Sequence, residues 1–489
     1  MNLLLVFLAA FCYFLICRQR RRVRLPPGPL SLPIFGALFS LPKVRPWETY
    51  RDWSQKYGSD FVYIDLPNQP MIILNSYKPV WDLMEKRSRN YVDRAVKLSD
   101  RLTGWDFAMS LLPYGTRWRE VRRTFHQHFS QAAVRRQHHD VILREVRAFL
   151  QRAARSKKDE RLDLGVVART FAGIVLDVIY GMEVEDEKHE LITLSAKGID
   201  VVNESRTNVF WVDYFPWLSY IPPWIPGSYR NLIKYARKHA PTVRAMKTQG
   251  FDIAIRDFMN GNAKPSMSRA LLQVLEDRYA GSDMYESQKS IALDATGIAY
   301  GEELTLIGVC QQTSIISAFL IGMAMNPAAQ KKAQEELDIV VGPHRLPTMD
   351  DIAGLPYIQA VLMECFRYMP VLPLNLPHDA VEDDEYEGYF IPRGCAIIVN
   401  TWAVLRDPVA YPYPDVFNPD RFIRNGTINP DVREPTMAFG VGRRICVGRH
   451  FATDSLSLMI ASLLHLFNIE SALSEGEELT SNSQTTLVT

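Results

Sequence analysis

The sequence has no cysteine pair with the spacing of a metal or redox site, and no segment with the composition of a flexible linker. Its six cysteines are spread over 489 residues without a Cys-x-x-Cys, which argues against a disulfide framework and a zinc site. No internal repeat or low-complexity stretch divides the chain, so we expect one large domain. The 56 basic and 55 acidic residues leave a net charge of +1, and this balance gives no indication of nucleic-acid binding.

The sequence pattern predicts a mainly helical protein with small β-sheets, which is an α+β fold class. Hydrophobic residues make up 47% of the chain and charged residues 23%, as is typical of a globular protein. Apolar residues recur at helical spacing over long stretches, whereas alternation is confined to short ones. The expected helices are 137–153, 165–182, 228–258 and 292–326, and the expected strands are 61–66, 71–74, 389–391 and 396–399, the last two forming a hairpin around 392–394.

The N-terminus has the pattern of a membrane anchor. Residues 2–17 carry no charge, and five arginines follow between positions 18 and 24. A cleavable signal peptide has its charges before the apolar run, so we expect residues 1–24 to be an uncleaved anchor with a basic flank. The positive-inside rule then places the rest of the chain in the cytosol, on a single-pass anchor in the endoplasmic reticulum membrane. A short helix or hairpin in the membrane interface is the alternative.

A single cysteine lies in the glycine- and arginine-rich segment 439–448, Phe-Gly-Val-Gly-Arg-Arg-Ile-Cys-Val-Gly. A thiolate is a strong ligand for iron. Glycines around Cys446 allow a tight turn and the close approach of a flat macrocycle. An apolar helical pattern over 449–467 places the cysteine at a helix N-terminus, where the dipole favours an anion. A buried cysteine in a turn is the alternative, but it would not require the phenylalanine, arginines and glycines together.

This segment resembles the haem-binding loop of the cytochrome P-450 superfamily, Phe-x-x-Gly-x-Arg-x-Cys-x-Gly, at every fixed position from Phe439 to Gly448. The resemblance covers roughly residues 25–470 and is strongest to membrane-anchored fungal members of secondary metabolism. It implies the P-450 fold and a haem b whose iron is bound by the Cys446 thiolate. It also implies insertion of one oxygen atom from O₂ into an apolar small molecule, such as a terpenoid or polyketide, with electrons from an NADPH-cytochrome reductase.

Four side chains resemble the residues that hold the haem propionates in this family. Trp118 and Arg122 lie one helical turn apart and match its Trp-x-x-x-Arg pair. His378, in Leu-Pro-His, and Arg444, two residues before the cysteine, complete the set. A solvated basic helix face and a solvated histidine are the alternatives. The motif around Cys446 favours the cofactor-binding interpretation.

Three further residues match the family's structural ion network. Glu364 and Arg367 form its Glu-x-x-Arg on one helix face, and Arg421, in Pro-Asp-Arg-Phe, resembles the arginine that completes the network. Surface pairing is the alternative, because Glu-x-x-Arg occurs by chance in many helices. The position of all three upstream of the cysteine loop favours a buried network that supports the loop.

The segment that resembles the helix over the distal haem face departs from the family pattern Ala/Gly-Gly-x-Asp/Glu-Thr. At the usual spacing it aligns with 307–311, which keeps Gly308 but has Cys310 for the acid and Gln311 for the threonine. A shift of two residues brings Thr313 to the threonine position and loses the glycine. Neither register contains a carboxylate. Gly308, Gln311 and Thr313 are therefore the candidate catalytic residues on this side, with a water that they hold as a substitute proton relay.

The C-terminal tail also departs from the family pattern. Residues 471–489 are polar and show no convincing alternation, so we expect a separate tail after a domain that ends at 470, without the usual closing β-hairpin. With the altered distal segment, this keeps two other classes open. One is a haem-thiolate isomerase or dehydratase that does not use O₂, and the other is a haem-binding pseudoenzyme.

Three segments are expected to surround the substrate. Residues 95–112, with Trp105, Phe107 and Met109, resemble the loop that lines the family's pocket, and 371–376 resemble another part of its wall. Residues 210–224 are rich in aromatic residues and prolines, which exclude a long helix. They form either a core loop or a roof that dips into the membrane interface, where Trp and Tyr are favoured.

Overall fold

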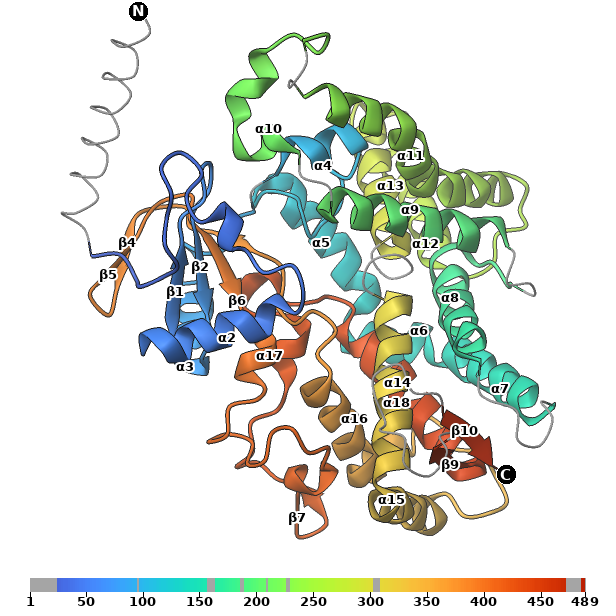
Figure 1. The fold of residues 1–489 in the computed structure, drawn as a ribbon. Helices are drawn as coiled ribbons and strands as arrows, with labels where there is room; N and C mark the ends of the chain where they lie inside the picture. Colours follow the sequence, from blue (N-terminus) through green and yellow to red (C-terminus); the bar gives the residue numbers. More distant parts are fainter. Residues whose placement is uncertain are drawn as a thin grey trace, which may run out of the picture.

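The computed structural model describes residues 24–94, 96–155, 163–184, 189–207, 210–225, 229–301, 308–471 and 485–488. In Figure 1 a small β-sheet lobe stands beside a larger helical body. None of the helices in the described part of the chain combines the length and the apolar composition that a membrane span needs. The expected anchor, 2–17, lies outside the described residues.

The sheet lobe joins strands from both ends of the chain. Its order is β1 (Phe61–Ile64), β2 (Met71–Leu74), β6 (Ala396–Val399) and β3 (His378–Asp379). β1 and β2 form the expected antiparallel pair, β2 and β6 run parallel, and β3 pairs antiparallel with β6. All four residues of β6 are buried, which fits an interior strand. This topology places His378 in the same sheet as the first strands of the chain, at the opposite edge from β1 and separated from β2 by β6.

The expected hairpin between 389–391 and 396–399 is wrong. β5 (Tyr389–Ile391) pairs instead with β4 (Asp384–Tyr386). The two residues between these strands, Glu387 and Gly388, both have positive φ, 50° and 76°, as a tight two-residue hairpin loop requires. The buried residues of β6 are paired within the four-stranded sheet, so β6 is not the partner of β5.

The helical body contains most of the expected helices, with boundaries shifted by a few residues. The expected helix 292–326 is described as two helices, α13 and α14, with 302–307 outside the described residues. The helices are α2 (Pro46–Tyr57), α3 (Tyr77–Val80), α4 (Leu98–Thr103), α5 (Thr116–Phe129), α6 (Gln131–Gln137), α7 (His139–Arg155), α8 (Leu164–Tyr180), α9 (Glu190–Thr207), α10 (Trp211–Tyr214), α11 (Arg230–Met259), α12 (Met267–Tyr279), α13 (Tyr285–Gly301), α14 (Gly308–Met325), α15 (Pro327–Val340), α16 (Pro356–Tyr368), α17 (Thr401–Val404) and α18 (Arg449–Leu466).

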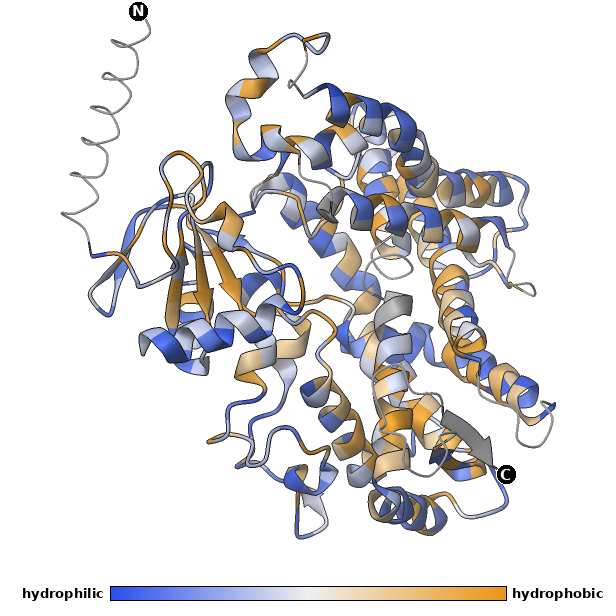
Figure 2. Cartoon of the chain, viewed as in Figure 1, coloured by the Kyte–Doolittle hydropathy of each residue, from blue (hydrophilic) through white to orange (hydrophobic). Residues whose placement is uncertain are grey.

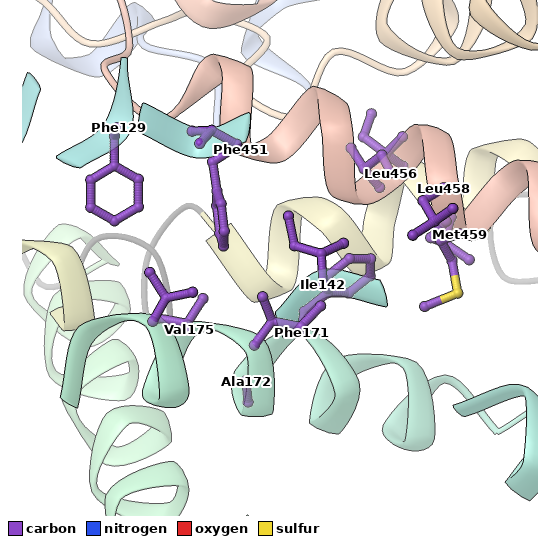
Figure 3. Close-up of a cluster of buried hydrophobic side chains, with 14 of the residues drawn as sticks. Phe129, Ile142, Phe171, Ala172, Val175, Phe451, Leu456, Leu458 and Met459 are labelled. Carbon is purple, nitrogen blue, oxygen red and sulfur yellow. The ribbon is translucent and has the colours of Figure 1, made fainter. Parts of the chain in front are cut away.

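The main core lies where α8 and α18 face each other. Phe171 and Val175 on α8 lie opposite Phe451 on α18 in Figure 3, with Phe129 and Ile142 from α5 and α7 closing the cluster. Figure 2 shows that α8 and the strands of the sheet are hydrophobic along most of their length, whereas α11 carries many hydrophilic residues. Helices that are apolar on most faces are buried. α18, the helix that follows Cys446, is buried over 455–464 and packs on α7, α14, α15 and α16.

The expectation that 471–489 lacks a strand is wrong. β10 (Thr485–Val488) pairs antiparallel with β9 (Asn468–Ser471), in a register that joins Thr485 to Ser471 and Val488 to Asn468. A run of four residues is too short to show alternation, and its partner lies on the other side of 472–484. The remaining short pair is β7 (Ile423–Arg424) with β8 (Thr427–Ile428).

Candidate haem site

The cysteine loop is held by glycines at positions that other residues could not occupy without strain. Gly440 and Gly442 have φ of 86° and 63°, in the left-handed region that favours glycine. A Cβ on Gly442 would lie 2.3 Å from the backbone oxygen of Met84. The Gly442 N–H donates to Glu85 Oε1 at 2.7 Å. The fixed glycine of the motif is thus explained by close packing of the loop against 81–86.

Cys446 is half-buried and closes a backbone ring with the start of the motif. Its N–H donates to the carbonyl oxygen of Phe439 at 2.9 Å, and its own carbonyl accepts from Arg449 Nη1 at 3.2 Å. The Phe439 ring packs edge-on against Phe366 of α16, with centroids 4.8 Å apart. Gly448 is the N-cap of α18. The position of the sulfur is therefore set by backbone hydrogen bonds and by packing on two core helices.

A buried ion network lies behind this loop. Glu364 and Arg367 of α16 are fully buried and joined by two hydrogen bonds of 2.7 and 2.8 Å. Arg421 reaches Glu364 at 3.3 Å, and Arg367 also donates to the carbonyl of Pro414 at 2.7 Å. The structure places the three residues predicted from the sequence together. Such a network resists separation, because each charge left alone would be buried without a partner.

The candidate haem-binding residues all line one hollow beside the cysteine. The residues named from the sequence come from α5, from the entry to β3 and from the cysteine loop. Other residues that the sequence did not indicate also line the hollow, among them Arg94 and Asn375. The predicted members are Trp118, Arg122, His378, Phe439, Arg444, Cys446 and Gly448.

Two guanidinium groups flank one indole in this hollow. The guanidinium carbons of Arg122 and Arg444 lie 5.2 and 4.9 Å from the ring centroid of Trp118. Arg122 Nη2 donates to the carbonyl of Ile445 at 2.9 Å, and Arg444 Nε donates to that of Val92 at 2.6 Å. Burial lowers the pKa of Arg122. A buried pair of cations in one wall fits an anionic ligand.

Trp118 supplies the clearest sign of that ligand. Its side chain is buried, yet its Nε1 has no hydrogen-bond acceptor among the described residues. A buried indole N–H normally finds a partner. A haem propionate would accept from this N–H and would be held by Arg122 and Arg444. The residues of the hollow therefore fit the anionic groups of a haem.

His378 is buried and turned by one hydrogen bond. Its Nδ1 lies 2.8 Å from the carbonyl oxygen of Tyr91, which can only accept, so Nδ1 carries the hydrogen and Nε2 is left for a ligand. Burial, followed by the charge of Arg94, holds the pKa of His378 well below its ordinary value. A propionate beside Nε2 would raise that pKa by favouring the charged ring.

The distal candidates are not all placed. Gly308 and Gln311 lie in the first turn of α14, and the side chain of Gln311 is outside what the structure describes. Thr313 is described: its hydroxyl oxygen is buried and has no hydrogen-bond partner in the described part of the chain, and the same holds for Nε2 of Gln312. Neither Thr313 nor Gln312 lines the hollow or the larger cavity beside it.

A cavity of about 640 Å³ adjoins the hollow. The two share Arg94, Ser110 and Leu376 in their walls. The rest of the cavity is formed by 96–101, by 210–219 and by the edge of the sheet lobe. The sequence pointed to 95–112, but Trp105 and Phe107 pack in the main core and line neither space, while Met109 lines the hollow.

Comparison with known proteins identifies the family. The family model for cytochrome P450 matches residues 26–489. The chain belongs to the cytochrome P450 family. Members bind haem through a cysteine thiolate, and Cys446 is that cysteine in this P450. The match runs through the tail that we expected to be separate.

The relatives of this P450 are fungal monooxygenases. It is 36% identical to the cytochrome P450 monooxygenase COX2 of Coprinopsis cinerea over 471 residues, which is 95% of this chain and 86% of that one. It is 35% identical to the cytochrome P450 monooxygenase ple1 of Rhodocybe pseudopiperita, over 96% and 87% of the two chains. It is 33% identical to the tryptamine 4-monooxygenase of Psilocybe cyanescens, over 95% and 90%.

Proposed function

We propose that this P450 inserts one oxygen atom from O₂ into an apolar small molecule of fungal secondary metabolism, such as a terpenoid or polyketide. The observation that carries the proposal is the cavity of about 640 Å³ that shares three wall residues with the hollow at Cys446. A cavity of this size accommodates a small organic molecule. When bound, the haem supplies oxygen activation, and its thiolate ligand favours cleavage of the O–O bond.

The residues of the chain hold and orient the cofactor. Trp118, Arg122, His378 and Arg444 bind the propionates, and the backbone ring from Phe439 fixes the sulfur. Charge-assisted hydrogen bonds of this kind contribute about 1.5–3 kcal/mol each. The Glu364 network ties α16 to the backbone of 405–418, and α16 supports the loop through the contact between Phe366 and Phe439.

The protein works on the cytosolic face of the endoplasmic reticulum with an NADPH-cytochrome reductase. The exposed side chains of Trp217, Tyr220 and Trp224 support a roof at the membrane interface. They lie in the segment that contacts 30–44 through the T-shaped pair Phe35–Phe215, with ring centroids 6.2 Å apart. Apolar substrates would then enter from the lipid.

The topology has a direct test in cells. Residues 203–205 and 425–427 both fit the N-glycosylation pattern. On the cytosolic side neither Asn203 nor Asn425 meets the glycosylation machinery, so we expect glycosidase treatment to leave the mobility of the protein unchanged. A glycan on either asparagine would reverse the proposed topology.

A second function is favoured by one specific observation. Gln311 stands where the family pattern has a threonine, and no carboxylate precedes it. A haem-thiolate isomerase or dehydratase needs no proton relay for oxygen activation, and a haem-binding pseudoenzyme needs none at all. The expected lack of a closing β-hairpin was the other reason for these alternatives. β9 and β10 form a closing strand pair, so that reason no longer applies.

Expression with a reductase in a fungal host, followed by metabolite profiling after feeding apolar pathway intermediates, tests the proposal. We expect a product that is heavier by one oxygen atom, formed only with NADPH and absent from the Cys446→Ala variant. Conversion without NADPH would identify the isomerase or dehydratase. A normal reduced CO complex without conversion of any compound would identify the pseudoenzyme.

A further inference from the structure

One acidic side chain lines the large cavity close to the haem site. Asp379 lies on β3, directly after the haem-site histidine, and is half-buried. Its Oδ1 accepts from Gln69 Nε2 at 2.8 Å, and its N–H donates to the carbonyl of Asp93 at 2.9 Å. Within the described part of the chain, no donor reaches its second carboxylate oxygen.

The charges nearest to this carboxylate are already engaged with the backbone. Arg94 Nη1 donates to the carbonyls of Leu376 and Pro377, and Arg444 Nε donates to the carbonyl of Val92. Both arginines lower the pKa of Asp379, whereas Asp93 raises it. No arginine donates a hydrogen bond to the Asp379 carboxylate among the described residues.

The other charged residues of the cavity are placed differently. Lys97 and Arg101 are exposed and lie at the rim. Asp213 accepts from the Ser99 hydroxyl at 2.7 Å and from the Ser99 N–H at 3.3 Å, so both of its carboxylate oxygens have a donor. Asp379 accepts from Gln69 at one oxygen, so among the described residues it keeps the capacity to accept from a molecule in the cavity.

The surroundings of the Asp379 carboxylate only partly replace the hydration that it loses on burial. Burial is the largest cause that raises the pKa of Asp379 to about 6, above the ordinary value for an aspartate. The group is therefore mostly ionised at cytosolic pH, although it has lost part of its hydration and received one neutral donor in return. A positively charged group beside it would restore the lost stabilisation.

We propose that Asp379 selects substrates that carry a basic nitrogen on an otherwise apolar body. This inference rests on the proposed function in one respect, because it takes the cavity as the substrate site. With the nitrogen held at Asp379, the apolar remainder extends past Ser110 and Leu376, the residues shared with the hollow at Cys446. The oxidised carbon is then remote from the nitrogen.

The test measures binding to the haem-loaded full chain by equilibrium dialysis. The probes are decyltrimethylammonium, its neutral isostere with a tert-butyl head, and decanoate. A quaternary nitrogen has no lone pair, so the probe cannot bind iron directly, and its charge does not change with pH. The quaternary nitrogen donates no hydrogen bond, so this probe reports the charge attraction of the carboxylate alone. At pH 7.5 we expect the cation to bind about tenfold tighter than the neutral isostere.

Asp379→Asn should remove this preference, and Asp379→Glu should retain most of it. Asp100→Asn is the matched control, because it removes a carboxylate from the same cavity wall at a different place. We expect it to leave the cation-to-isostere ratio within about twofold of the parent value. The reduced CO spectrum of each variant shows that the haem site is intact.

The pH dependence gives an independent readout. A protonated Asp379 is neutral, so the preference for the cation should be complete above pH 7 and should be lost as the pH falls through about 6. Burial keeps the pKa of Cys395 well above its ordinary value, so this thiol does not account for a transition there. His378 is retained in Asp379→Asn, so a transition that persists in this variant would belong to His378 and would overturn the assignment to Asp379. The Asp379→Asn variant should show a flat ratio.

Equal binding of the cation and its isostere by the parent protein would overturn the inference, and so would tighter binding of decanoate. Equal losses in Asp379→Asn and Asp100→Asn would also overturn it, because a general effect of cavity charge would then suffice. The binding assay does not depend on turnover. Failure of the oxygenation experiment with an intact cation preference would reject only the proposed function.

Discussion

The two faces of the haem site differ in how closely their residues follow the family pattern. On the cysteine side the motif from Phe439 to Gly448 is complete, and Glu364, Arg367 and the backbone of the loop are hydrogen-bonded within the protein. On the distal side, Cys310 and Gln311 stand where the pattern has an acid and a threonine. The residues that bind a haem and the residues that deliver protons to bound oxygen are therefore separate sets, and a sequence can keep the first while it changes the second.

The largest effect is expected at the sulfur itself. Cys446→Ala removes the thiolate, so the reduced CO complex should lose the red-shifted Soret band of thiolate-bound haem, and product formation should cease. Absorption spectroscopy of the purified variant measures this. An unchanged spectrum would mean that another residue binds the iron, and the description of the cysteine side would be wrong.

The buried network should contribute the next largest effect. Glu364→Gln removes one charge and leaves Arg367 and Arg421 buried without an anion, which should cost about 3–5 kcal/mol of stability. Urea denaturation followed by circular dichroism measures it. Glu335→Gln is the control, because its partner Lys331 lies 3.9 Å away and both side chains are exposed. That exposed pair should contribute less than about 1 kcal/mol.

The four residues that bind the propionates should contribute a smaller effect, which is confined to haem affinity. They are Trp118, Arg122, His378 and Arg444. Trp118→Phe keeps an aromatic ring at this position but removes the indole N–H. Haem affinity should therefore fall by about 1.5–3 kcal/mol, with little change in the fold. Transfer of haem to apomyoglobin measures the loss. Trp105→Phe is the matched control: its Nε1 is also buried without a partner among the described residues, but it lines no part of the hollow. Equal losses of haem affinity in both variants would mean that the Trp118 N–H does not bind a propionate.

The smallest effect is expected on the distal side. Substitutions there should change the fraction of consumed NADPH that leads to product, and should leave the free energy of unfolding unchanged. Gln311 cannot release a proton at neutral pH, and Cys310 is a weak acid. Installing Asp at 310 together with Thr at 311 should raise the ratio of product formed to NADPH consumed severalfold. Alanine at both positions is the control and should not raise it. A parent protein that already converts nearly all of the NADPH that it consumes into product would show a lower ratio after the double change. That result would contradict the contrast between the two faces.

The parts of the site that the sequence predicted are those fixed by backbone geometry. Gly442 must be glycine because a Cβ there would lie 2.3 Å from the backbone oxygen of Met84, so this fixed position of the motif has a geometric cause. Strand partners were harder to predict, because β6 pairs with β2, which lies more than three hundred residues earlier in the chain. The β9–β10 pair was missed because the four residues of β10 are too few to show alternation.

The residues that line the substrate cavity could not be predicted from local pattern. Asp379 has no motif, and its importance depends on Gln69 and on the burial that the sheet lobe provides. Trp105 and Phe107 were expected in the pocket because they lie in the right segment. The structure buries them in the core, since a loop presents only some of its side chains to the cavity.

Incubation of the holoenzyme with its reductase, NADPH, the substrate found by profiling and ¹⁸O₂ tests whether this P450 inserts oxygen from O₂ into its substrate. We expect a product that contains a single ¹⁸O atom, with no label taken from H₂¹⁸O when ordinary O₂ is used. A product that forms at the same rate without O₂ or NADPH, and that contains no new oxygen atom, would contradict it.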